Sequence, residues 1–204
     1  MTQIHIQPLT ADRSDTAFAL TTEVFAQDST LHAALGTDLE TYRKTLRPNF
    51  DAMVAEGQSF VAMDDAKRCL GAILATDLVL STSDKPAHTA VAALTRDLTQ
   101  TYLDLRRPQI GEALLVDMAA IRRDARGRGI YPALRHAVHV HARDLGWRYV
   151  VGELSSPATQ HVVLTQMGHT KIAEIAFADF EWQGTRPFQS IVSPPSIILA
   201  EGRL

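Results

Sequence analysis

The sequence contains a single cysteine and no long apolar segment, and both absences narrow the class of protein. Cys69 has no second cysteine to pair with, so no disulfide can form within the chain, as is usual for proteins of a reducing compartment. No run of about 18 apolar residues is present, and the first residues lack the basic-then-apolar pattern of a signal peptide. We therefore expect a cytoplasmic protein that does not contact membranes.

An excess of charge of one sign is also missing. The formal net charge is -3 over 204 residues, which gives no general attraction to nucleic acid. His136, His139 and His141 lack the glutamate and the spacing of a zinc site, so we expect no metal. The length and a hydrophobic content of 46% suit one globular domain spanning residues 1–204.

Apolar periodicity predicts an α/β (α+β) fold with a mixed central sheet and helices on both of its faces. Thr37 or Asp38 is a candidate N-cap for the second helix. The tail 184–204 contains three prolines, so we expect it to form short edge strands. The expected strands are 4–9, 59–63, 69–78, 114–121, 147–154 and 169–182, and the expected helices are 11–26, 39–56, 90–107 and 133–145.

The most informative segment is Arg126-Gly127-Arg128-Gly129-Ile130-Tyr131-Pro132, between an expected strand and an expected helix. Glycines at such a junction let backbone N–H groups point into one concavity, where the helix N-terminus adds partial positive charge. Pro132 suits the first helical position. The segment therefore predicts a pyrophosphate-binding loop, with a basic, solvent-exposed turn as the alternative.

Arg126, Gly129 and, imperfectly, Tyr131 resemble the Arg-x-x-Gly-x-[Gly/Ala] coenzyme A loop of the GNAT superfamily of acyltransferases. Residues 158–169 are similar to that family's later helix, which typically ends in Tyr-x-x-x-Gly-Phe. A weaker resemblance links residues 25–31 and 177–188 to arylalkylamine N-acetyltransferases. Ser29 stands where that group has a glutamate, so its substrate specificity is not implied.

The GNAT resemblance implies a single GNAT-like domain that uses acetyl-CoA as co-substrate. The central strand would bind the pantetheine arm and the thioester carbonyl through its backbone, and the loop would bind the pyrophosphate. The cofactor-binding residues implied in this way are Met118, Ala119, Ala120, Ile121, Arg126, Gly127, Arg128, Gly129, Ile130 and Tyr131.

Three residues are candidates for the chemistry. Asp117 is a carboxylate within an apolar strand, which makes it either a general base or a structural carboxylate paired with an arginine or a backbone N–H. Ser155 could orient the amine or the thiol, but we expect either Ser155 or Ser156 to cap the following helix. Leu164 stands where the family has a proton-donating tyrosine, so His161, Thr165 or water would protonate the leaving thiolate.

Two regions outside the central strand also contain reactive side chains. Asp28 and His32 would border an acceptor pocket, although we expect them to be loop or helix-surface residues. A covalent route through Cys69 has no support in the sequence.

Two hypotheses follow for the function. The first is an acetyl-CoA-dependent N-acyltransferase in which a primary amine, on a small molecule, attacks the thioester directly. The alternative is a catalytically degenerate GNAT domain that binds acyl-CoA as a sensor or interaction module. A homodimer with strands exchanged through the tail is possible under either hypothesis.

Overall fold

The computed structural model describes residues 3–82 and 87–204. Seven strands form a mixed sheet in the order β1-β2-β3-β4-β5-β7-β6, which confirms the expected α/β class. The chain forms two compact units, and β4 (Ala113–Ile121) contributes to both of them. Unit 1 comprises Met1–Asp28, Thr37–Thr76 and Val116–Gly146, and unit 2 comprises Ser29–Gly36, Asp77–Leu115 and Trp147–Leu204.

The other strands are β1 (Ile4–Pro8), β2 (Phe60–Asp64), β3 (Cys69–Asp77), β5 (Tyr149–Leu154), β6 (Thr170–Ala176) and β7 (Ser196–Arg203). The α-helices are α1 (Ala11–Asp28), α2 (Thr30–Ala34), α3 (Leu39–Ala55), α4 (Leu78–Ser81), α5 (Ala90–Arg106), α6 (Ile130–Asp144) and α7 (Pro157–Gln160). A short 3-10 helix, η1 (Arg123–Ala125), precedes α6, and a π-helix, η2 (His161–Gln166), follows α7. No helix in these described ranges has both the length and the apolar composition needed to cross a membrane.

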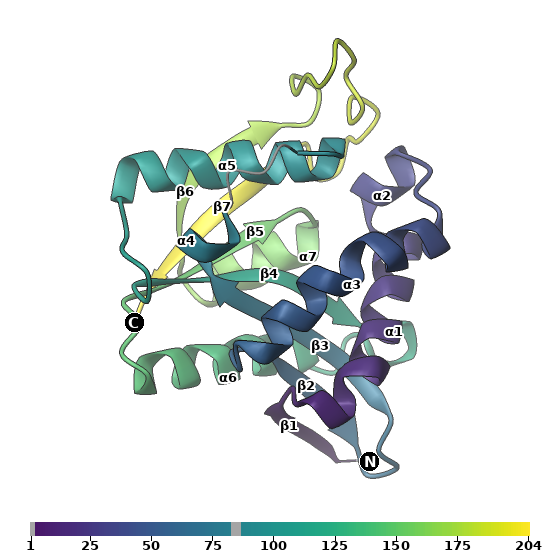
Figure 1. Ribbon diagram of the computed structural model, residues 1–204, viewed down its shortest axis with the longest axis vertical. Coiled ribbons are helices and arrows are strands. Elements are labelled where there is room, and N and C mark those ends of the chain that lie inside the picture. Colours follow the sequence, from purple (N-terminus) through teal and green to yellow (C-terminus); the bar gives the residue numbers. More distant parts are fainter. Residues whose placement is uncertain (1–2, 83–86) are drawn as a thin grey trace. The chain divides into compact units, whose positions relative to one another are not determined.

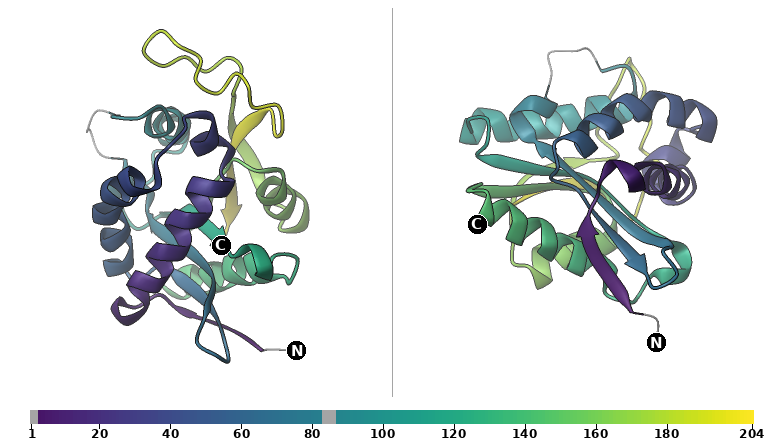
Figure 2. Two further views of the ribbon diagram at one scale, coloured as in Figure 1. Left: turned by 90° about the vertical axis from the view of Figure 1, so that its right-hand side faces the viewer. Right: turned by 60° about the horizontal axis from the view of Figure 1, so that its bottom comes forward.

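Unit 1 is built on the hairpin β2–β3, with β1 antiparallel beside β2 (Figures 1 and 2). Successive strand side chains point to opposite faces, and each face has its own helices. Val61 and Leu74 belong to the core that α1 and α3 form with the sheet. On the other face, Phe60 meets His141 of α6 edge to face, with ring centroids 5.4 Å apart. The two strands of the hairpin are as the sequence predicts.

Unit 2 is built on β5, β7 and β6, and α5 packs against them through an apolar core (Figure 1). Glu201 of β7 is buried there and is fully paired. Its carboxylate accepts a 2.7 Å hydrogen bond from the hydroxyl of Tyr102, and Arg106 donates from Nε at 3.0 Å and from a terminal nitrogen at 2.9 Å. These hydrogen bonds connect α5 to β7.

The structure corrects the expectation for the tail. β7 is not an edge strand, because it pairs antiparallel with β5 on one side and with β6 on the other, and nearly all of its residues are buried. Pro194 and Pro195 precede the strand, so neither removes a hydrogen bond from its ladders. The described structure thus gives this strand partners on both of its edges within the chain.

Two element boundaries also differ from the prediction. β6 ends at Ala176, because a turn in which the N–H of Asp179 donates to the carbonyl of Ala176 interrupts the strand. Helix α6 begins at Ile130, three residues earlier than expected, so Pro132 is the third helical residue and not the first. The first-turn N–H groups of a helix have no partner within it, so proline is tolerated there as well. The N-cap of α3 is Asp38, one of the two candidates.

Candidate functional site

The turn between β4 and α6 is exposed to solvent at residues 126–129. Gly127 and Gly129 both have φ of 73°, in the left-handed region that favours glycine, and no described atom lies within 4 Å of the position that a Cβ would take. Gly129 is the N-cap of α6 and, as a glycine, has no side chain with which to cap the helix. We call residues 127–131 the 127–131 cradle. Its geometry suits an anion at a helix N-terminus.

The arginines before the cradle are held by carboxylates. Arg123 and Arg126 both donate to Asp28, the last residue of α1, and the Nε of Arg123 is 2.9 Å from one of its carboxylate oxygens. Asp28 is only 16% exposed, and its hydrogen bond from Arg123 is the main reason that its pKa lies below the ordinary value. Asp28 is therefore not a surface residue as we expected, and it neutralises part of the positive charge beside the loop.

Arg122, on the same loop as these arginines, is also paired. Arg122 donates to Asp124 at 2.7 and 2.6 Å, and its backbone N–H donates to the carbonyl of Leu70. His32, also expected on the surface, lies buried in α2, and burial lowers its pKa.

A cavity of about 690 Å³ lies in unit 1 beside the end of α1. Its wall comes from the second half of α1, the turn between β2 and β3, and the start of the loop after β4. Charged side chains of both signs line it, and they are Glu23, Asp28, Lys67, Arg68, Arg122, Arg123 and Asp124. The cavity therefore borders the same loop that leads into the cradle.

Cys69 also borders this cavity, but it is a poor nucleophile. The residue is buried, and burial raises the pKa of its thiol to about 11. Very little thiolate is present near neutral pH. A covalent acyl intermediate on this cysteine is therefore unsupported by the structure as well as by the sequence.

The second half of β4, from Asp117 to the loop before the cradle, has one side that is partly accessible to solvent. Along the strand, Asp117, Ala119 and Ile121 are more exposed than Met118 and Ala120, which are buried. This alternation leaves a track of small and apolar side chains on the accessible side. The four residues that the GNAT resemblance assigns to the pantetheine arm lie on this track or directly behind it, and their role stays a prediction.

Asp117 is accessible to water, although nearby protein atoms reduce the hydration of its carboxylate. The residue is exposed, yet surrounding protein atoms displace enough water to raise its pKa from 3.8 to about 6. The carboxylate therefore reaches water on one side while protein atoms surround it on the others, and this partial loss of hydration disfavours its charged form. A carboxylate in such a place can exchange a proton near neutral pH.

Tyr42 of α3 lies near enough to Asp117 for the two groups to interact electrostatically. Burial, and to a smaller extent the charge of Asp117, raise the pKa of Tyr42 above its ordinary value. The phenol therefore keeps its proton at neutral pH, where it can donate or accept a hydrogen bond, and the raised pKa makes it a weaker acid than an ordinary tyrosine. Nothing in the sequence pairs these residues, because they are 75 positions apart on different elements.

The two other candidates for the chemistry lie in unit 2. Ser155 follows β5 and is half-buried, and Ser156 caps α7 through a reciprocal pair of hydrogen bonds with Thr159. The capping role is therefore confirmed for Ser156. His161 is exposed at the start of η2, the π-helix that also contains Leu164. The roles of Ser155 and His161 in catalysis stay predictions.

Comparisons with known proteins show where this architecture occurs. No protein-family profile and no curated protein sequence matches the chain. Among solved structures, the C-terminal condensation domain of Ebony, in complex with β-alanyl-dopamine, aligns with a TM-score of 0.88 at 17% identity, over 100% of both chains. A mosquito arylalkylamine N-acetyltransferase-like protein, 5b, aligns with a TM-score of 0.80 at 17% identity, over 99% of this chain and 100% of its own.

A polyamine N-acetyltransferase of Drosophila melanogaster aligns with a TM-score of 0.76 at 19% identity, over 99% of this chain and 100% of its own. Identities this low establish a common fold and leave the activity open. The chain has the GNAT fold, the fold of these N-acetyltransferases.

Proposed function

We propose that the protein is an acetyl-CoA-dependent N-acyltransferase, in which a primary amine on a small molecule attacks the thioester directly. The observation that carries this proposal is Asp117, a water-accessible carboxylate whose pKa is raised to about 6. It lies on the strand that leads into the 127–131 cradle. A proton acceptor beside a track for the donor, followed by an anion-binding turn, is the set of groups that this reaction requires.

In this proposal the donor's pyrophosphate lies against the backbone N–H groups of the 127–131 cradle, and its pantetheine arm lies along residues 118–121. Asp117 is mostly ionised at pH 7 because its pKa is about 6. It can therefore take a proton from the amine, directly or through one water molecule. The amine nitrogen bonds to the carbonyl carbon as the C–S bond breaks, and the sulfur leaves as a thiolate.

The thiolate then needs a proton. A free thiol has a pKa of about 8.5, so water can supply it at some loss of rate. Ser155 and His161 are proposed as groups that assist this end of the reaction, and Tyr42 adds a protonated phenol close to Asp117. The acceptor amine is not defined by these residues.

The arginines are proposed to bind the donor's phosphates. Asp28 competes with the phosphates for Arg123 and Arg126, because both arginines donate hydrogen bonds to it. Arg126 gives up its contact with Asp28 if it turns to a phosphate, so the gain in affinity from this arginine is reduced. We expect Arg126→Ala and Arg128→Ala to weaken coenzyme A more than dephospho-coenzyme A or pantetheine. Equal losses for the three ligands would mean that the arginines do not contact the phosphates.

Calorimetry with a matched pair of variants tests the cradle. Gly129→Asn and Gly129→Asp both place a side chain at a left-handed position that asparagine and aspartate tolerate better than most residues do, but only aspartate adds negative charge. We expect Gly129→Asp to lose much more affinity for coenzyme A than Gly129→Asn, with similar thermal unfolding of the two. Equal affinities would remove the cradle as the pyrophosphate site.

Thiol release from acetyl-CoA, measured over a panel of amines, separates the enzyme from its alternative. An enzyme releases thiol only when a suitable amine is present. The degenerate domain would bind coenzyme A in calorimetry and release no thiol with any amine of the panel.

A second candidate is amide condensation with an aminoacyl donor. It is favoured by the alignment with the condensation domain bound to β-alanyl-dopamine and by the engagement of Arg123 and Arg126 with Asp28. A donor without the nucleotide of coenzyme A does not need these arginines. Comparing β-alanyl-pantetheine with acetyl-CoA as donors for the same amines tests this: condensation predicts faster amide formation from the aminoacyl donor.

A further inference from the structure

Arg135 of α6 is fully buried, with 0% of its surface exposed. None of its three guanidinium nitrogens has a hydrogen-bond partner in the part of the chain that the structure describes. The residues beside it on the inner side of the helix, Leu134 and Val138, are buried and apolar. An apolar residue at position 135 would therefore satisfy the packing of α6, and packing alone does not explain an arginine.

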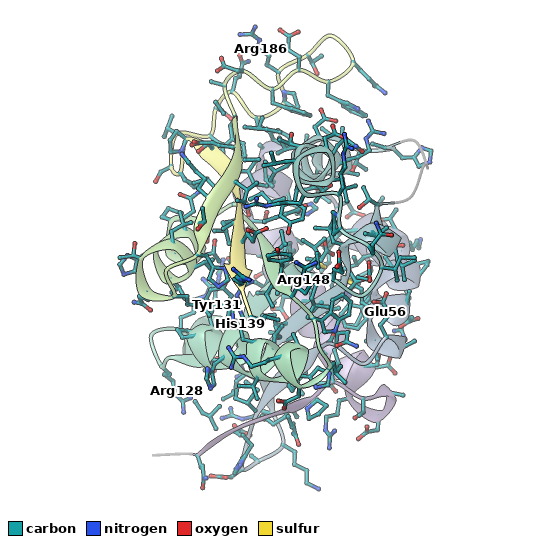
Figure 3. The ribbon with its side chains drawn as sticks, turned by 90° about the vertical axis from the view of Figure 1, so that its left-hand side faces the viewer. Glu56, Arg128, Tyr131, His139, Arg148 and Arg186 are labelled. Carbon is teal, nitrogen blue, oxygen red and sulfur yellow. The ribbon has the colours of Figure 1, made fainter. Side chains whose placement is uncertain are left out.

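Tyr131 is the neighbour of Arg135 one helical turn earlier. The two residues are four positions apart, so their side chains lie on the same side of α6. Tyr131 is partly exposed. Burial has the largest effect on the pKa of both residues, and the electrostatic interaction between them has a smaller effect in the opposite direction. In Figure 3, Tyr131 and His139 lie along one side of α6, and Arg128 lies on the other side.

The direction of the Arg135 side chain relates it to the 127–131 cradle. Helical side chains tilt toward the helix N-terminus, so the guanidinium of Arg135 extends back over the turn that contains Tyr131. Tyr131 is also the last residue of the cradle. Arg135 thus lies one helical turn beyond the end of the cradle, and its guanidinium is close enough to Tyr131 for the two groups to interact electrostatically.

A guanidinium keeps its charge in proteins, and an unpaired buried charge is strongly unfavourable. Its planar fork of donors matches the oxygen pairs of phosphates and carboxylates. We propose that Arg135, with the partly exposed Tyr131 beside it, forms an internal subsite for an oxyanion of the acyl donor. The proposal rests on the proposed function and also gives a role to Tyr131, which stands where the GNAT loop has glycine or alanine.

The test compares Arg135→Met and Arg135→Lys with a control, Arg143→Met. Arg143 lies on the same helix but is exposed, so the control removes the same charge from the surface. Calorimetry is performed with coenzyme A, dephospho-coenzyme A, pantetheine and succinyl-CoA, and thermal unfolding of each variant is measured without ligand. We expect Arg135→Met to unfold at the temperature of the wild type or above it, because it removes an unpaired buried cation.

The ligands distinguish two sources of the oxyanion. If it is a phosphate, Arg135→Met weakens coenzyme A by about tenfold or more, as expected for a hydrogen bond to a charged group, and leaves pantetheine unchanged. If it is a carboxylate on the acyl group, only succinyl-CoA is weakened. In both cases Arg135→Lys recovers part of the loss, and Arg143→Met matches the wild type.

The proposal is overturned if Arg135→Met binds every ligand as the wild type does, since the guanidinium would then contact internal water only. It is also overturned if Arg135→Met unfolds at a lower temperature and loses all ligands equally, which would indicate a structural role. If the wild type binds no coenzyme A derivative, the proposed function fails by itself. The subsite is then tested with inorganic phosphate, which should raise the unfolding temperature of the wild type but not that of Arg135→Met, and no rise in the wild type would overturn it.

Discussion

Replacing Asp117 with asparagine should stabilise the protein at neutral pH, although it removes the proposed general base. Burial raises the pKa of Asp117 to about 6, whereas the unfolded chain has the ordinary value of 3.8. The folded protein therefore holds the proton more tightly than the unfolded chain does. An ionised Asp117 destabilises the fold, and this destabilisation is absent below about pH 4, grows between about pH 4 and 6, and is constant above that.

The size of the effect follows from the same shift. A rise from 3.8 to about 6 would correspond to about 3 kcal/mol in full. Because Asp117 is exposed to water, screening reduces this, and we expect about 1 kcal/mol. Asparagine has nearly the same shape and no charge, so Asp117→Asn should gain that amount at high pH and nothing at low pH.

Urea unfolding at about pH 4 and about pH 8 measures the difference directly. The control is Asp144→Asn, which changes an exposed carboxylate of α6 in the same unit and should alter stability by a similar, small amount at both pH values. If Asp117→Asn is less stable than the wild type at about pH 8, the carboxylate is held by stabilising partners and the argument for a base is wrong.

Three further predictions concern other sites. Iodoacetamide at about pH 8 should leave Cys69 unmodified in the folded protein and alkylate it after denaturation, because burial raises the pKa of its thiol to about 11; rapid modification of folded protein would contradict this. Glu201→Gln should lower the free energy of unfolding by about 1–3 kcal/mol, since it weakens the buried bonds from Tyr102 and Arg106, and an unchanged urea midpoint would contradict the pairing. Asp28→Asn should destabilise the protein at neutral pH by a margin that shrinks as the pH falls through the lowered pKa of Asp28, and a margin that is independent of pH would show that the two ion pairs contribute nothing.

The sequence predicted the elements well where side-chain periodicity decides them. The hairpin β2–β3 and the helices α3 and α5 follow from apolar spacing and local caps, and their bounds agree within two residues. The prediction for the tail was wrong for a physical reason. Its prolines suggested an edge, but they lie before β7, and the central place of that strand depends on partners far away in the sequence.

The candidate site was predictable only in part. The glycines of the 127–131 cradle carry a local signal, since they adopt the left-handed conformation that glycine favours. The sequence contains no local signal that shows which charged groups pair with each other. Asp28 reaches Arg123 across 95 positions, and Tyr42 interacts with Asp117 across 75, so both pairings come from tertiary structure. The burial of Arg135 was equally hidden, because an arginine in an amphipathic helix is usually exposed.

Amine-dependent turnover by the wild type and by Asp117→Asn, measured against pH, tests the proposed chemistry most directly. With an amine that the wild type accepts, we expect kcat/KM to fall as the pH drops below about 6, where Asp117 becomes protonated. Asp117→Asn should lose about a hundredfold or more of this activity, the usual contribution of a general base, while its affinity for coenzyme A changes little. An unchanged rate in Asp117→Asn, with the same pH profile as the wild type, would contradict the assignment of Asp117 as the base.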